Sequence, residues 1–228
     1  MKIYYEVIGE GFPIVLLHGN GEDHHIFDRL VEDLKKSYQL ILIDSRYHGK
    51  SPCVGELSYQ QMCEDVKEVI SELSLEHYDV IGFSDGGIEA LMLAMDDERL
   101  AHAVCIGANT KPQNIKLFYR IAFYIQMVCL MVFALYHQKA RLQLKLIRLM
   151  LREPHIEYDD LKKINIPVLV LAGEYDLIKQ SDTEMIASCL PYSVLKIIKQ
   201  GNHVLLKDHY SRTSQEIISF LNVCHQEE

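Results

Sequence analysis

Short hydrophobic runs alternate along the chain with longer segments that have helical periodicity. These runs lie at residues 3–8, 13–18, 38–44, 77–83, 101–107, 167–172 and 193–199. Their centres, such as IVLL and VLVLAG, contain consecutive apolar residues, which is typical of strands buried on both faces. Alternating strands and helices predict βαβ units, so we expect an α/β fold with a mostly parallel central sheet and helices on both faces.

Two segments carry apolar residues at helical spacing. The first covers residues 59–75 and follows Ser58, a residue type that favours the N-cap position. Its apolar face would consist of Met62, Val66, Ile70 and Leu73. The second covers residues 208–224 and predicts a helix that packs last onto the sheet.

Residues 111–153 interrupt this alternation, because they contain no strand pattern and are strongly basic. Eight basic side chains stand against one acid, a net charge of +7, whereas the remaining residues sum to -16. The basic residues are Lys111, Lys116, Arg120, Lys139, Arg141, Lys145, Arg148 and Arg152. We therefore expect a core domain of residues 1–110 and 154–228, with residues 111–153 inserted as a small helical cap.

Three structures could account for the inserted segment. A transmembrane helix needs roughly 20 apolar residues, but the uncharged stretch at 121–136 has only 16. We favour a pair of helices that pack over the core domain and line a pocket. A basic lid that docks reversibly on an anionic membrane surface is the third possibility. The cap could also support a homodimer, and no residue pattern decides this.

Composition and charge exclude several classes of protein. With 228 residues, 49% of them hydrophobic, the chain fits one large globular domain. Its net charge of -9 disfavours binding to nucleic acid, which depends on basic surfaces. The six cysteines are scattered, and the first residues lack a signal-peptide pattern, so we expect reduced thiols and a cytoplasmic location.

The strand at 77–83 runs directly into the sequence Gly82-Phe83-Ser84-Asp85-Gly86, a G-x-S-x-G motif followed by a helical pattern. Such a strand-turn-helix lifts the serine hydroxyl above the sheet on a strained turn, and the glycines leave room for that turn. The first N–H groups of the helix also point toward developing negative charge. Ser84 is therefore a candidate nucleophile.

A serine hydroxyl needs a positioned imidazole to remove its proton and a carboxylate to orient that imidazole. Downstream, Asp176 follows the hydrophobic run at 167–172, and His203 follows the run at 193–199. Both would lie past the carboxyl ends of strands, where open α/β sheets place their ligand sites. Glu174 and Asp182 are rival acids, and we prefer Asp176.

With these residues in this order, the chain resembles the α/β-hydrolase superfamily over nearly its whole length. His18-Gly19-Asn20 resembles the family's His-Gly oxyanion loop. The segment from Asp44 to Ser51 resembles its D-x-R-x-x-G-x-S motif, with Tyr47-His48 where Gly-His is more usual. The resemblance implies that the backbone N–H groups of Asn20 and Asp85 form the oxyanion hole, and that a cap lies between two strands.

The resemblance also implies the activity. We expect a serine hydrolase that cleaves carboxylic esters or related small acyl compounds through an acyl-enzyme, without a cofactor or a metal ion. A carbon-carbon bond hydrolase or perhydrolase of the same fold, or a ligand-binding sensor with little turnover, are the alternatives. Candidate walls of the substrate pocket are Phe27, Phe83, Phe118, Tyr119 and Met127.

The carboxylate beside the nucleophile has two possible roles. Asp85 could attract a cationic group of the substrate, such as an α-amino group. Alternatively, its side chain could bind a neighbouring loop, which we favour.

Overall fold

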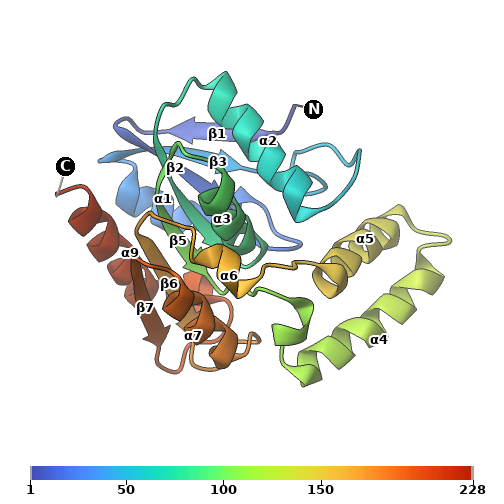
Figure 1. The fold of residues 1–228 in the computed structure, drawn as a ribbon. Helices are drawn as coiled ribbons and strands as arrows, with labels where there is room; N and C mark the ends of the chain where they lie inside the picture. Colours follow the sequence, from blue (N-terminus) through green and yellow to red (C-terminus); the bar gives the residue numbers. More distant parts are fainter. Residues whose placement is uncertain (1, 227–228) are drawn as a thin grey trace.

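A computed structural model describes residues 2–226, which contain one seven-stranded sheet (Figure 1). The strands are β1 (Tyr5–Ile8), β2 (Phe12–Leu17), β3 (Tyr38–Ile43), β4 (Tyr78–Phe83), β5 (Leu100–Ile106), β6 (Val168–Gly173) and β7 (Ser193–Ile198). Their order is β1-β3-β2-β4-β5-β6-β7, and only β1 runs antiparallel to its neighbour. The predicted α/β fold with a mostly parallel sheet is confirmed, and each strand lies within two residues of its predicted position.

Helices cover both faces of this sheet. One face packs against α1 (Asp28–Leu34) and α9 (Tyr210–Cys224), and the other against α2 (Tyr59–Glu72), α3 (Asp85–Asp96) and α7 (Gln180–Cys189). Successive strand residues enter opposite layers, so Ile14 and Leu16 face one core while Val15 and Leu17 face the other. The hydrophobic runs lack polar alternation for this reason.

The helix starts follow local sequence. The Ser58 side chain caps α2 by accepting a 3.3 Å hydrogen bond from the Gln61 N–H, as its position before the helix predicts. The helix expected at residues 208–224 is present as α9, which begins two residues later than expected. A short helix, α8 (Leu205–Asp208), ends at His209, whose backbone leaves the helical region, and α9 begins at Tyr210.

The path of the chain through the sheet creates a crevice. From β2 the chain moves outward to β3 and then returns to β4 on the opposite side of β2. The strand order therefore reverses between β2 and β4, and loops at the carboxyl ends of such strands diverge and leave room for a ligand. Asn20 follows β2 and Ser84 follows β4, so both candidate site residues lie at this switch point.

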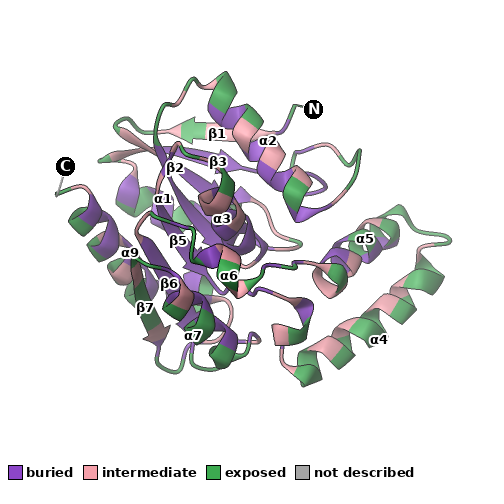
Figure 2. Ribbon diagram, viewed as in Figure 1, coloured by how far each residue is buried: buried purple, intermediate pink, exposed green. Residues whose placement is uncertain are grey.

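Between β5 and β6, the inserted segment forms two antiparallel helices, α4 (Leu117–Phe133) and α5 (Gln138–Arg152), which we call the α4–α5 hairpin. Helix α5 is amphipathic and buries Leu144, Ile147 and Leu149, among others. Helix α4 has no buried residue and stands away from the sheet (Figure 2). Two short helical turns, η2 (Pro112–Asn114) and α6 (Tyr158–Leu161), flank the hairpin.

The transmembrane alternative for this segment is wrong. Within residues 2–226, no helix combines the length and apolar character needed to cross a bilayer. Helix α4 has 17 residues, shorter than the roughly 20 that a span needs.

Candidate active site

Ser84 occupies a strained turn between β4 and α3. Its φ of +54° lies in the left-handed region, which residues other than glycine rarely adopt. The neighbouring glycines are required sterically, because a Cβ on Gly82 would lie 2.0 Å from the Gly86 carbonyl oxygen, and one on Gly86 would lie 2.0 Å from the Leu17 carbonyl oxygen. The Ser84 N–H donates to the Ile106 carbonyl at 2.7 Å, which fixes the turn on the neighbouring strand β5.

The three candidate triad residues form a chain of hydrogen bonds. His203 Nε2 lies 2.9 Å from Ser84 Oγ, and His203 Nδ1 lies 2.8 Å from Asp176 Oδ1. Ser84, Asp176 and His203 follow β4, β6 and β7, so the parallel sheet brings all three to one edge. In this arrangement Nδ1 carries the proton that faces the carboxylate, which leaves Nε2 able to accept the serine proton.

The carboxylate of Asp176 is buried yet held in its ionised form. Burial alone would raise its pKa, but hydrogen bonding and charge attraction from His203 and a 2.9 Å bond from the Ile178 N–H lower the pKa below its ordinary value. The rival acids are engaged elsewhere. Glu174 accepts the Gln200 N–H, and Asp182 accepts the backbone N–H and hydroxyl of Thr110.

The loop after β2 lies directly against the nucleophile. A Cβ on Gly19 would lie 3.1 Å from Ser84 Cβ, so the backbone of this loop approaches the serine closely. The N–H groups of Asn20 and Asp85, one from each side of this contact, donate to no main-chain carbonyl in the described part of the chain. They are available for an oxygen that develops negative charge.

The side chains of these two residues bind each other. Asn20 Nδ2 donates to Asp85 Oδ2 at 2.9 Å and approaches the Leu146 carbonyl of α5 at 3.3 Å. Burial raises the pKa of the Asp85 carboxyl, although bonds from Asn20 and Tyr59 oppose the shift. The Asp85 side chain therefore connects the loop after β2 with α3.

Two buried histidines fix the neighbouring loops. His18 Nε2 accepts the Ser45 N–H, and His48 Nε2 accepts the Gly21 N–H, both at 3.0 Å. Each ring directs Nδ1 at a backbone carbonyl, so each donates there and is neutral. Burial lowers the pKa of His18 and, together with the proximity of His18, lowers that of His48 to about 4. Both act on the backbone of the site loops.

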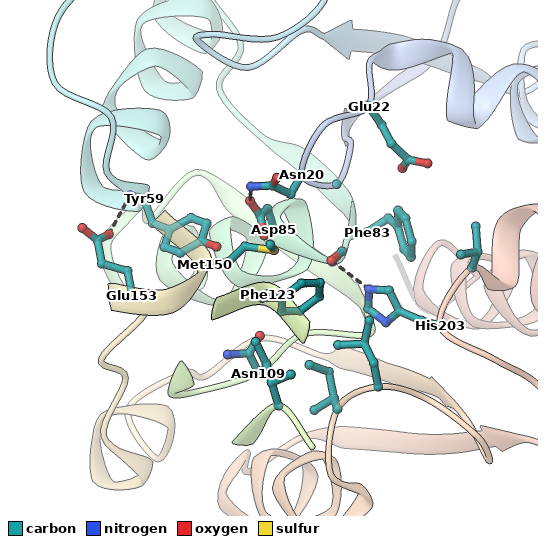
Figure 3. Close-up of a pocket in the computed structure, with 16 residues that line it drawn as sticks. Asn20, Glu22, Tyr59, Phe83, Asp85, Asn109, Phe123, Met150, Glu153 and His203 are labelled. Atoms are coloured by element: carbon teal, nitrogen blue, oxygen red, sulfur yellow. Dashed lines mark hydrogen bonds between the residues drawn. The ribbon is translucent and has the colours of Figure 1, made fainter. Parts of the chain in front are cut away.

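A cavity of about 250 Å³ opens over Ser84 and His203 (Figure 3). Polar groups of Asn20, Asp85 and Asn109 line it together with apolar side chains. The apolar wall consists of Tyr59, Phe83, Ile115, Phe123, Met150, Leu177, Ile178 and Val204. A cavity of this size fits a small acyl group.

Of the five predicted wall residues, the structure places only Phe83 at this cavity. Phe27 is fully buried in the core under α1, and Phe118 is 77% exposed on α4. Tyr119 is also exposed, and Met127 lies one helical turn beyond the cavity. The cavity is instead closed by Phe123 of α4 and Met150 of α5, which sequence reasoning missed.

Two further side-chain groups place three possible metal-ligand atoms within 4.8 Å of one another. They are Asp23 with His24 and His25, and Asp79 with His102 and His225. In the second group the Asp79 carboxylate bonds both imidazoles, each at 2.8 Å. Neither group includes Ser84, Asp176 or His203.

Comparisons with known proteins concern the family and the fold. A family model described as "alpha/beta hydrolase fold" matches residues 13–128, just over half of the chain. The AB hydrolase superfamily protein YisY of Bacillus subtilis is 38% identical over 93 residues, which are 40% of this chain and 35% of that protein. The pimeloyl-[acyl-carrier protein] methyl ester esterase of Legionella pneumophila is 32% identical over 97 residues, 42% of this chain and 38% of that protein. Each match therefore spans little more than a third of the relative's length.

Solved structures resemble the chain over nearly its whole length. A hydrolase from Pseudomonas aeruginosa superposes with a TM-score of 0.80 at 18% identity, covering 96% of this chain and 94% of its own. At this identity the likeness concerns the fold.

Proposed function

The chain belongs to the alpha/beta hydrolase fold family, and on that basis we propose that it is a serine hydrolase that cleaves carboxylic esters or related small acyl compounds. The observation that carries the proposal is the hydrogen-bonded chain Ser84–His203–Asp176 beside a cavity, with distances of 2.9 Å and 2.8 Å. An esterase among the similar proteins supports the ester class of substrate.

In the first half of the reaction, Ser84 Oγ attacks the carbonyl carbon of the substrate while His203 Nε2 accepts the serine proton. The imidazolium then donates this proton to the departing alcohol oxygen, which breaks the ester bond and leaves an acyl group on Ser84. Asp176 holds the imidazole with Nδ1 protonated and stabilises its positive charge.

In the second half, a water molecule gives a proton to His203 Nε2 and attacks the acyl group on Ser84. Collapse of the new tetrahedral intermediate returns the proton to Ser84 and releases the carboxylic acid. The N–H groups of Asn20 and Asp85 bind the negatively charged oxygen in both halves. Loss of one such donor typically lowers the rate by ~10²- to 10³-fold.

The test is intact-mass analysis after exposure to a fluorophosphonate, with Ser84→Ala as the matched control, followed by hydrolysis of esters of increasing acyl length. We expect one adduct on the wild type and none on the variant. A folded wild-type protein that forms no adduct would contradict the proposal and favour a ligand-binding role for the cavity. Adducts of equal yield on both proteins would place the reactive group elsewhere.

We further propose a cytoplasmic location. All six cysteines are free thiols, and Cys53 and Cys129 are exposed, which supports a reducing compartment.

A further inference from the structure

Helix α4 presents an apolar surface to solvent over most of its circumference. Residues at one face, including Phe123, Met127 and Leu130, are half-buried against α5 and the cavity. The opposite face, which we call the outer face, consists of Phe118, Ile121, Ile125, Val128 and Val132, each at least half exposed. Further exposed side chains flank it, namely Leu117, Tyr119, Tyr124, Met131, Phe133, Leu135 and Tyr136.

Such a helix is unusual for the surface of a protein in water. A surface helix normally shows one apolar stripe toward the core and polar residues elsewhere, whereas a helix that is apolar all round is buried in protein or in lipid. Large exposed apolar patches mark interaction sites. Within residues 2–226, the main packing partner of α4 is α5, and no residue of α4 is buried.

The charge of the hairpin indicates the kind of surface that it meets. Residues 117–152 contain six basic side chains and no acidic one. Lys139 and Arg152 are exposed, and neither has an acidic partner within residues 2–226. The residues outside 111–153 sum to -16, so the inserted segment that carries the apolar helix differs from the rest of the chain in having a net positive charge. A negatively charged surface with an apolar interior would match both the apolar outer face of α4 and the positive charge of the hairpin.

We propose that the α4–α5 hairpin docks on an anionic lipid bilayer. Helix α4 lies in the plane of the interface with its outer face among the acyl chains, and exposed basic side chains of the hairpin such as Lys139 and Arg152 approach the lipid headgroups. Lys145 is not among them, because it contacts Tyr47 of the core domain. The helix is too short to span the bilayer, so docking is peripheral.

A second copy of the chain fits the outer face less well. Two hairpins in contact would bring two sets of six positive charges together, which opposes association. Packing of one helix along the outer face would also leave flanking residues such as Tyr124, Met131 and Phe133 in water. A lipid interface covers the outer face and both flanks at once.

Docking would bring the cavity close to the bilayer, because the α4–α5 hairpin forms part of the cavity wall. Phe123 projects from the inner side of α4, and Met150 comes from α5 (Figure 3). A bilayer at the outer face would therefore lie within one helix diameter of the cavity, which favours an acyl substrate that partitions into lipid. The docking itself does not depend on the proposed reaction.

The experiment is flotation of the protein with vesicles of phosphatidylcholine alone and of phosphatidylcholine mixed with phosphatidylglycerol, in low and in high salt. We expect flotation with the mixed vesicles in low salt, and weaker flotation in high salt or without phosphatidylglycerol. The double variant Ile125→Glu/Val128→Glu should lose flotation and retain hydrolysis of a short water-soluble ester. Val54→Glu/Val223→Glu, the same change at exposed positions of the core domain, should float like the wild type.

The basic side chains are tested separately. Lys139→Gln/Arg152→Gln should weaken binding to the mixed vesicles by roughly fivefold per cation removed, since one cation near an anionic surface contributes about 1 kcal/mol. Lys36→Gln/Lys199→Gln, which removes two exposed lysines of the core domain, should leave binding unchanged.

Three results would overturn the proposal. One is the absence of wild-type flotation with mixed vesicles, and another is unchanged flotation of Ile125→Glu/Val128→Glu. The third is a stable dimer in sedimentation velocity that this double variant dissociates, which would assign the outer face to a second copy. Ser84→Ala should float like the wild type, so a failure of the proposed reaction is distinguishable from a failure of docking.

Discussion

The Asn20 amide donates a 2.9 Å hydrogen bond to the Asp85 carboxylate and so joins the two backbone segments whose N–H groups face the candidate oxyanion position. Neither side chain needs to touch the substrate for this bond to matter. It sets the spacing between the loop after β2 and the first turn of α3.

If this positioning role is correct, Asn20→Ala should lower kcat/KM by about tenfold, the effect of losing one hydrogen bond that orients the site. Asp85→Asn keeps an acceptor and should cost less, with equal losses on neutral and amino-acyl esters. The measurement is kcat/KM on a matched pair of such esters. A loss confined to the amino-acyl ester would instead assign Asp85 to recognition of a substrate cation.

Asp176→Asn should lower kcat by roughly 10⁴-fold while the protein remains folded, because an amide at this position favours the wrong imidazole tautomer. Glu174→Gln provides the matched control, since Glu174 accepts the Gln200 N–H and does not contact His203. Steady-state hydrolysis and circular dichroism of both variants test this. Equal losses in the two variants would show that Asp176 is not the orienting acid.

Glu89 is a buried carboxyl in the second turn of α3, and neither of its oxygens has a hydrogen-bond partner among the described residues. Burial raises its pKa well above the ordinary 4.5. The Glu89 carboxyl group therefore binds its proton more tightly in the folded chain than in the unfolded chain. The stability that this protonated carboxyl contributes is fully present below pH 4.5, and it is lost as the pH rises through the pKa of Glu89 in the folded state.

Glutamine cannot ionise, so Glu89→Gln should abolish the loss of stability at high pH. We expect the variant to be more stable than the wild type at pH 8 by about 1 kcal/mol, or roughly 2–4 °C in Tm, and this difference should disappear toward pH 4.5. Thermal melts across this pH range measure the effect. Glu76→Gln, at an exposed glutamate, should show no comparable trend. Destabilisation by Glu89→Gln at pH 8 would mean that the ionised carboxylate has a partner in solution.

Phe123→Ala should change acyl-chain preference, because it removes a ring from the cavity wall. We expect longer acyl groups to gain relative to short ones by roughly tenfold in kcat/KM, the range that changes in a hydrophobic pocket produce. Phe118→Ala removes the same ring from the exposed outer face and should leave the preference unchanged. The converse pattern would place Phe118 at the substrate.

The sequence predicted the strands closely because apolar runs such as that of β6, buried on both faces, have few competing interpretations. It also predicted the approach of Ser84, Asp176 and His203, since three motifs at three strand ends must meet at one edge of a parallel sheet. The start of α2 followed from Ser58. In each case the information was local, or the topology converted local signals into proximity.

The cavity wall required information that the sequence lacks. Helix α4 is apolar all round, so its periodicity does not identify the inward face, and only packing against α5 places Phe123 inside and Phe118 outside. The cluster of Asp79, His102 and His225 was invisible for a related reason. Its members come from two strands and the segment after α9, and only the finished sheet brings them together.

Ser84 and His203 touch although 119 residues separate them in the chain. During synthesis, the turn that carries the serine emerges long before the loop that carries the imidazole, and β7 must join the sheet edge before the two can meet. A partly made chain on the ribosome thus holds a serine with the poor nucleophilicity of any other alcohol. If a nascent chain carried out the proposed ester hydrolysis, this would show that the sheet had assembled completely, including its last strand.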